Sequence, residues 1–314
     1  MFRRTQRSPH RYGLGALSAP LRIGLVRPSR SGGEILSQVL GRLHFFIQIL
    51  LKTAFFYWAI KKIRTFARNF APNPMKVELF VPCIVDQFFP TVASHTMKVL
   101  ERTGVEVEYN PEQTCCGRFA YNAGFVEDAK DLGDKFLNDF SYDGPVVAPS
   151  AACVHYIKKR YPELFFNTAN HLNFKRMVAN VYELTDFLVN KVHFDDFGAE
   201  FPYKVTFHDS CSALRGLGLG KEARQLLSKV RGLELLEMKQ TDMCCGADFS
   251  MEVNQGTLAM GMASHKVKNA MNTGAEYIVS TDMTCLMHQR AYIEKEGLPI
   301  KVIHIAEVLA SGWE

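Results

Sequence analysis

One cysteine pattern occurs twice in this 314-residue chain: an isolated cysteine, then a Cys-Cys-Gly triplet, then another isolated cysteine. Its members, which are all the cysteines of the chain, are Cys83, Cys115, Cys116 and Cys153, followed by Cys211, Cys244, Cys245 and Cys285. Matching members lie 128, 129, 129 and 132 residues apart. Loop insertions in a duplicated domain produce a drift of this size, so the pattern predicts a unit that is built twice.

The segments between the cysteines match as well. KVELFVPC and KVTFHDSC are apolar strands that end at the first cysteine of each copy. The first cysteine is followed by an expected helix, at 88–103 in the first copy and 221–231 in the second, and then by a strand, VEVEYN or LELLEMK. Cys-Cys-Gly opens a second expected helix, at 128–139 or 256–272. A third strand, PVVAPS or YIVSTD, and a closing segment, VYELTDFLV or VIHIAEVLA, complete each copy. Their order is the same in both copies.

Strands that alternate with helices at this spacing predict an α/β fold. We expect two duplicated α/β units, each with a mainly parallel sheet flanked by helices, preceded by an N-terminal extension. The predicted domains are residues 1–74, 75–200 and 201–314, where the first is a basic, partly apolar extension and the other two each hold one copy of the cysteine pattern.

The extension differs in charge from the rest of the chain. Residues 1–74 hold thirteen Lys or Arg and one acid, Glu34, and carry +12, whereas the remainder, with 24 basic and 31 acidic residues, carries −7. The basic charge therefore belongs to the extension, and no nucleic-acid partner is expected. Residues 43–60 are apolar around Lys52, and a basic segment follows, so residues 43–68 predict contact with a membrane surface. An organelle transit peptide and an unstructured leader are the alternatives.

Eight thiols in a long chain without a secretory signal indicate metal or redox chemistry rather than disulfides. In a parallel α/β sheet, ligands gather beyond the carboxyl ends of the strands, where every cysteine here is expected. The four thiols of each copy are therefore predicted to meet. Four thiolates suit an iron-sulfur cluster, structural zinc or, without metal, a dithiol redox centre. Zinc knuckles of the C-x₂₋₄-C kind are absent from the sequence, which favours iron-sulfur.

Five further residues are candidates around these thiols. Gly117 and Gly246 allow the backbone to turn so that amide N–H groups approach the sulfurs. His208 and Asp209, whose counterparts in the first copy are apolar, are weak catalytic candidates for hydrogen bonding or proton transfer. Arg118 is a third weak candidate, which could balance negative charge. The Gly-rich stretch 216–220 lacks G-x-G-x-x-G spacing, and the sequence shows no dinucleotide, flavin or P-loop motif.

From residue 75 to the C-terminus the chain resembles the cysteine-rich CCG-domain proteins, most closely the lactate utilisation proteins. Relatives include the iron-sulfur component of glycolate oxidase and a component of heterodisulfide reductase. The resemblance rests on TCCGRFAYNAGF, the HDSC and MCCG segments, KVRGLELLE and KVIHIAEVLASG. It implies that the eight cysteines bind iron-sulfur clusters, one per domain. The reductases carry Cys-x-x-Cys where this chain has Ser150 to Cys153 and Asp282 to Cys285, so we expect four-thiolate [4Fe-4S] sites with an oxygen ligand from Ser150 or Asp282.

The resemblance further implies an electron-transfer subunit of a multi-protein complex that oxidises L-lactate, or another 2-hydroxy acid, to pyruvate. Its expected partners are an iron-sulfur protein and a third subunit. The expected location is the cytoplasm, with possible peripheral contact at the inner face of the membrane. Two alternatives stay open: a thiol-disulfide redox enzyme resembling heterodisulfide reductase, and a structural zinc-binding interaction module.

Overall fold

The computed structural model describes residues 74–140 and 143–313. The unit that runs from Asn73 to Glu314 contains all of them. The predicted extension, with its apolar run and basic segment at 43–68, lies outside the described residues. Within the described part, no helix has the length and apolar character needed to cross a membrane.

The first half of this unit contains a four-stranded parallel sheet with strand order β2-β1-β3-β4. Its strands are β1 (Lys76–Leu79), β2 (Glu106–Glu108), β3 (Val146–Ala148) and β4 (Val181–Glu183). Its helices are α2 (Cys83–Phe88), α3 (Pro90–Arg102), α4 (Arg118–Asn122), α5 (Val126–Asp139), α6 (Ala151–Phe165), α7 (His171–Asn180), α8 (Leu184–Asp186) and the π-helix η1 (Phe187–Lys191).

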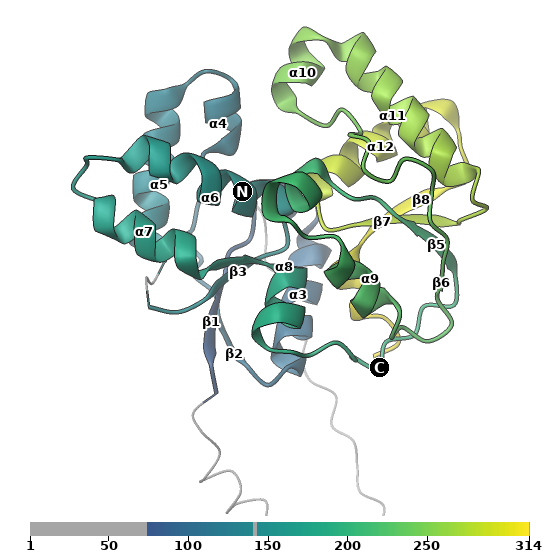
Figure 1. Cartoon of the computed structure of the whole chain (residues 1–314), viewed down its shortest axis with the longest axis horizontal. Coiled ribbons are helices and arrows are strands. Elements are labelled where there is room, and N and C mark those ends of the chain that lie inside the picture. The colour runs from purple at the N-terminus through teal and green to yellow at the C-terminus, as the bar shows by residue number, and fades with distance from the viewer. Residues whose placement is uncertain (1–73, 141–142, 314) are drawn as a thin grey trace, which may run out of the picture. The chain divides into compact units, whose positions relative to one another are not determined.

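The second half repeats this topology with strand order β6-β5-β7-β8, again with parallel pairs. Its strands are β5 (Lys204–Phe207), β6 (Glu234–Leu235), β7 (Tyr277–Ser280) and β8 (Lys301–His304). Its helices are the π-helix η2 (Ser212–Leu217), α9 (Lys221–Leu227), α10 (Phe249–Asn254), α11 (Gly256–Met271), α12 (Met283–Glu296) and α13 (Ile305–Leu309). The predicted pair of duplicated α/β units is confirmed (Figure 1).

The apolar strands explain why helices cover both faces of each sheet. All three residues of the central strand β3 are fully buried, as Val77 and Leu79 of β1 are. A parallel strand that is apolar on both sides requires a helical layer on each face. Helix α3 supplies such a layer, because its buried residues recur at helical spacing along one side.

The largest hydrophobic core of the described residues is shared by the two halves. The largest cluster of buried side chains combines Val77 and Leu79 of the first half with Val205 and Phe207 of the second. Helix α3 packs against α13, and α8 packs against α9. On the side that carries the cysteines, α6 packs against η2 and α12 against α2. The boundary near residue 200 stays a prediction, since residues 73–314 form one compact unit.

The predicted helices differ from the observed ones in two ways. The segment predicted as one helix at 88–103 is divided at Phe89, and α3 begins with Pro90 at its first position, where proline is tolerated. The Cys-Cys-Gly triplets do not open the longer helices. Short helices come first, namely α4 after Gly117 and α10 after Asp248, whose carboxylate accepts from the first-turn amides. The chain therefore makes a short turn of helix beside the sulfurs before the longer helix starts.

Candidate metal centres

The four cysteines of the first half, called the first set below, lie at the carboxyl ends of three adjacent strands. Cys83 is the first residue of α2, which follows β1, and Cys153 is the third residue of α6, which follows β3. Cys115 and Cys116 lie in the loop between β2 and α4. The parallel sheet therefore brings together residues that are far apart in the sequence, as the strand-end argument predicted.

The sulfurs of the first set form a continuous row. Cys83 Sγ lies 3.5 Å from Cys115 Sγ. Cys116 hydrogen-bonds on one side with Cys115 and on the other with Cys153. All eight cysteines of the chain are free thiols.

The second set, Cys211, Cys244, Cys245 and Cys285, repeats this arrangement. Cys211 lies directly before η2, and Cys285 is the third residue of α12. Cys244 hydrogen-bonds with Cys211 and Cys245, and Cys245 also hydrogen-bonds with Cys285. Each half of the molecule thus gathers four thiols in the same order.

One sulfur of each vicinal pair is held as a thiolate. Hydrogen bonds from Cys116 and Cys83 lower the pKa of Cys115 to about 3. Hydrogen bonds from Cys211 and Cys245 lower the pKa of Cys244 to about 2. The donating thiols Cys83 and Cys211 have a raised pKa because they share a proton with these neighbours. A thiolate is the form that binds metal, so both sets contain a ligand that is ready at neutral pH.

Gly117 and Gly246 shape the backbone beside these thiolates. Their φ angles are +91° and +87°, and a Cβ atom at either position would lie 2.8 Å from a helix carbonyl oxygen, that of Ala129 or Ala259. Their amides donate to Cys115 Sγ and Cys244 Sγ, each over 3.4 Å. The sharp turn and the amide donors that the sequence predicted are both present; contact with a cofactor stays a prediction.

Ser150 and Asp282, the predicted oxygen ligands, are buried at the starts of α6 and α12. Ser150 Oγ accepts from the amide of Cys153 over 3.3 Å. Asp282 Oδ1 accepts from the amide of Thr284 over 3.1 Å, and its Oδ2 accepts from the amide of Ala152 over 2.8 Å. Asp282 therefore caps helices in both halves. These hydrogen bonds account for the conformation of both side chains without a metal, and the ligand role stays a prediction.

Arg118 is a buried cation that lies between the two sets. Its side chain is 8% exposed, and Nη2 donates to Thr284 Oγ1 over 3.1 Å. Burial alone would lower the pKa of Arg118, but Cys153 and Asp282 outweigh burial and raise it, with smaller effects from Cys116 and Cys285. One guanidinium thus acts on thiols of both halves, which supports the predicted charge-balancing role.

Asp209 has a charged partner in its own half of the molecule. Its carboxylate forms a two-bond ion pair with Arg224, Oδ1 with Nη1 over 2.9 Å and Oδ2 with Nη2 over 2.8 Å. Arg224 also pairs with Glu237 at the surface. The ion pair fixes Asp209 against α9, and a part in proton transfer stays a prediction.

His208 lies directly against the second set. Its side chain is fully buried, and neither ring nitrogen has a hydrogen-bond partner. A ring nitrogen and the sulfurs of Cys245 and Cys285 all lie within 4.8 Å of one another, the one such trio of potential metal ligands among the described residues. Burial, and then the charge of Lys266, lower the pKa of His208 to about 3, so the imidazole is neutral at physiological pH.

Lys266 is a residue that the sequence analysis missed. It lies on α11, is fully buried, and donates from Nζ to the carbonyls of Gln240 and Thr241 over 3.0 and 2.6 Å. Burial lowers the pKa of Lys266, and the charges of Cys245 and Asp209 offset part of this effect. Its place on the predicted helix 256–272 was no signal of burial, because a lysine on a helix is normally exposed.

The first set can be reached from the surface. A cavity of about 220 Å³ is lined by Cys83 and Cys115 together with Val81, Gln113 and Thr114, among others. Gln113 holds the wall in place, because its Oε1 accepts from the amide of Val81 over 2.7 Å.

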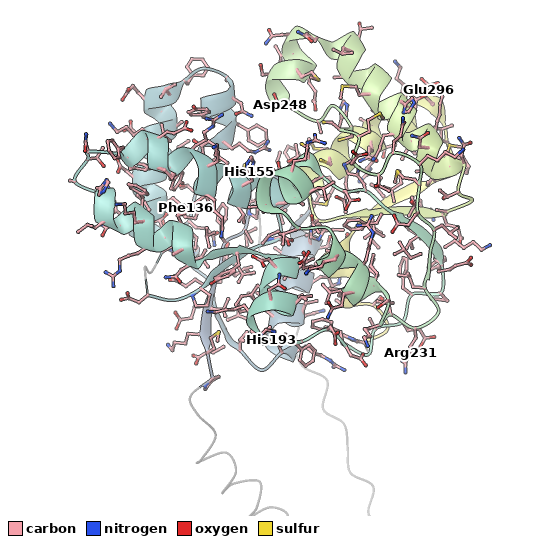
Figure 2. The ribbon with its side chains drawn as sticks, in the orientation of Figure 1. Phe136, His155, His193, Arg231, Asp248 and Glu296 are labelled. Atoms are coloured by element: carbon pink, nitrogen blue, oxygen red, sulfur yellow. The ribbon has the colours of Figure 1, made fainter. Side chains whose placement is uncertain are left out.

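The segments that follow the two Cys-Cys-Gly triplets also contact each other. Figure 2 shows Asp248 at the start of α10, and Asn122 of α4 donates to its Oδ2 over 2.8 Å. Because Asp248 also caps α10, the two segments that follow the Cys-Cys-Gly triplets are tied together.

Two parallel α/β halves, each with a vicinal cysteine pair and two isolated cysteines at its strand ends, define a tandem cysteine-rich domain protein. The family model of the CCG cysteine-rich domain matches residues 77–158 and 205–290. The chain therefore belongs to the CCG cysteine-rich domain family, and its relatives there are lactate utilization proteins.

The chain is 39% identical to lactate utilization protein A of Geobacillus thermodenitrificans (strain NG80-2) over 236 residues, which covers 75% of this chain and 98% of that protein. It is 37% identical to lactate utilization protein A of Halalkalibacterium halodurans over 235 residues, 75% of this chain and 96% of that one. Among solved structures, a hypothetical protein from Helicobacter pylori is similar with a TM-score of 0.54 and 12% identity, over 77% of this chain and 51% of that one. This last likeness concerns the fold alone.

Proposed function

We propose that this protein is an iron-sulfur electron-transfer subunit of a multi-protein complex that oxidises L-lactate to pyruvate. The observation that carries the proposal is the pair of four-thiol sets at the strand ends, in a chain that is similar to lactate utilization protein A over nearly the whole length of that relative. Oxidation of lactate to pyruvate releases two electrons and two protons. In this role the protein would receive the electrons from the partner that oxidises lactate and pass them to another partner.

The donor sets fit iron-sulfur clusters. The first set, Cys83, Cys115, Cys116 and Cys153, would hold one cluster, and the second set, Cys211, Cys244, Cys245 and Cys285, would supply thiolates to the other. Thiolates are the usual ligands of such clusters, which supply one-electron transfer when bound. The amides of Gly117 and Gly246 donate to the sulfurs, and Arg118 offsets negative charge. Hydrogen bonds and nearby charge of this kind set the reduction potential.

The proposal extends to partners and location. We infer an iron-sulfur partner protein and a third subunit, on the strength of the family resemblance. Eight free thiols suit the reducing cytoplasm. Membrane contact through residues 43–68 is tested by deleting residues 1–74 and measuring whether the protein still sediments with vesicles that contain anionic lipid.

A thiol-disulfide enzyme is the second candidate, because the Cys115 thiolate lines a surface cavity. In that case Cys115 would attack a substrate disulfide, form a mixed disulfide and expel one substrate thiolate. The neighbouring thiol of Cys83, after passing its proton to the expelled thiolate, would then attack Cys115 Sγ in the mixed disulfide, release the second substrate thiolate and leave a Cys83–Cys115 disulfide.

Anaerobic purification of the full chain, with iron, sulfide and zinc analysis and EPR spectra before and after dithionite, tests the proposal. We expect roughly eight irons and matching sulfide per chain, four for each cubane, and a reducible signal. Cys115→Ser and Cys244→Ser should each remove one cluster and leave the other, so each variant controls for the other. Zinc without redox activity, or disulfide reduction by metal-free protein, would overturn the electron-transfer function.

A further inference from the structure

The two sets differ at one position that faces the sulfurs. Phe80 and His208 both lie three residues before the first cysteine of their set. The amide of Phe80 donates to Val147 in β3 over 2.9 Å, and the amide of His208 donates to Val279 in β7 over 2.8 Å. The two residues therefore occupy equivalent places in their sheets. His208, the first residue of the polar pair His208 and Asp209, corresponds to Phe80.

The residue packed beside this position differs as well. Phe136 lies seven residues after Ala129, and Lys266 lies seven residues after Ala259; these two alanines approach Gly117 and Gly246 in the same way. In the first half, Phe80 and Phe136 pack edge to face with ring centroids 4.9 Å apart. In the second half, His208 and Lys266 replace this aromatic pair. One half is apolar where the other carries an imidazole and an ammonium group.

His208 has no partner that would explain it as an ordinary core histidine. Among the described residues, it is the one histidine with both ring nitrogens buried and unpartnered. His288 shows the ordinary arrangement: its Nε2 lies 3.1 Å from the carbonyl of Ala259, and its Nδ1 lies 3.2 Å from Glu252. Buried polar groups are nearly always hydrogen-bonded, so two vacant nitrogens require an explanation.

The surroundings of His208 indicate a metal. A neutral imidazole is the commonest metal ligand among side chains, and the sulfurs of Cys245 and Cys285 lie within 4.8 Å of its nitrogen. Lys266 Nζ donates its hydrogen bonds to the carbonyls of Gln240 and Thr241. Because it makes none to His208, the imidazole is free to face the sulfurs.

We propose that His208 is a ligand of the second centre, which is therefore a mixed imidazole-thiolate site, whereas the first centre is ligated by thiolates and faced by Phe80. This inference rests on the proposed function, since it concerns the cluster that the second set would hold. Exchange of an anionic thiolate ligand for a neutral imidazole raises the reduction potential of an iron-sulfur centre, and the ammonium group of Lys266 acts in the same direction. Electrons should therefore pass from the first centre to the second.

The test uses the full chain, loaded with iron under anaerobic conditions, with Cys115→Ser to remove the signal of the first centre. Pulsed EPR of the dithionite-reduced protein should show a strong nitrogen coupling that changes when histidine is labelled with ¹⁵N. His208→Phe, which places the first-half residue in the second half, and His208→Asn should both abolish this coupling and shift the midpoint potential downward. His288→Gln should leave the coupling unchanged.

The outcomes separate this inference from the proposed function. A reduced centre without histidine coupling in the parent protein, or with coupling that persists in both His208 variants, overturns the ligand role while the electron-transfer function stands. If the second site takes zinc instead of iron, X-ray absorption decides: a nitrogen neighbour lost in His208→Asn supports the ligand role, and an all-sulfur shell overturns it. If neither iron nor zinc binds to the second set, both proposals are wrong.

Discussion

At the scale of single residues, the charge of Arg118 is what most clearly links the two cysteine sets. It is buried and hydrogen-bonded to Thr284 of the other half, and it lies within electrostatic reach of Cys153, Cys116 and Cys285. The corresponding position in the second half is Ala247. One cation therefore acts on the thiols of both sets.

Replacing Arg118 by Gln should lower the midpoint potential of the first centre. A positive charge stabilises the reduced, more negative cluster, so its loss should shift the potential downward by on the order of 100 mV. Arg118→Lys keeps the charge and should retain most of the parent potential. Redox titration monitored by EPR provides the measurement. A potential that changes equally in both variants would show that packing, not charge, is what Arg118 contributes.

The cysteines and glycines of the sites could be predicted from the sequence because they recur at nearly constant offsets. The role of Lys266 could not, since a lysine on a helix is normally exposed and only the packed structure shows it at 0% exposure. That both ring nitrogens of His208 lack a hydrogen-bond partner could not be predicted either, because hydrogen-bond partners depend on tertiary contacts. Arg118 could be singled out by its place after Cys-Cys-Gly, but its contact with Thr284 depends on how the halves pack.

At the scale of elements, the two halves begin their last helices with different caps. Glu183 accepts from the first-turn amides of α8, and His304 accepts through Nδ1 from the amide of Ala306 in α13. Both residues are buried and titratable. Burial raises the pKa of Glu183 to about 8 and lowers that of His304 to about 4. Equivalent helix starts therefore respond to pH in opposite directions.

His304 should make the protein less stable in acid. Its pKa of about 4 lies below the ordinary value of 6.5, so between these values the unfolded chain binds more protons than the folded one. Its contribution is present above pH 6.5 and is lost as the pH falls through 4, by up to about 3 kcal/mol. His304→Asn retains a capping side chain and should reduce the fall in the free energy of unfolding between pH 7 and 4.

Urea unfolding at several pH values measures this difference. The exposed His193 offers a matched control, because His193→Asn should leave the pH dependence as in the parent. The same acid sensitivity in His304→Asn would assign the effect to other groups.

Element types and order could be predicted better than helix boundaries. The apolar strands fix the sheet, but the division of 88–103 into α2 and α3 and the insertion of α4 and α10 depend on local capping and turn geometry. Asp248 is the N-cap of α10, and aspartate is one of the residue types that favour this position. The start of a short helix there could therefore have been predicted from the sequence.

At the scale of the whole molecule, the described unit joins two equivalent halves through their packing. Helices α3 and α13 pack against each other. The guanidinium carbon of Arg102 lies over the ring of Trp313, 4.7 Å from the ring centroid. Trp313 also donates to the carbonyl of Phe197 over 3.1 Å. On the side of the cysteines, Asp282 caps a helix in each half. The duplication could be predicted from the sequence, but this mutual burial could not, since helical periodicity does not identify the partner of an apolar face.

The shared core predicts that neither half is stable alone. Expressed separately, residues 74–195 and 196–314 would each expose the apolar surface that α3 and α13 bury between them, together with Val77 or Val205 of the common cluster. We expect each piece alone to lack a cooperative urea transition, and the co-expressed pieces to form a one-to-one complex that unfolds cooperatively. Size-exclusion chromatography and urea unfolding measure both properties. Two monomeric pieces that unfold cooperatively at the midpoint of the intact chain would mean that the halves are independent domains, and that Arg118 and Asp282 join them without supporting their folding.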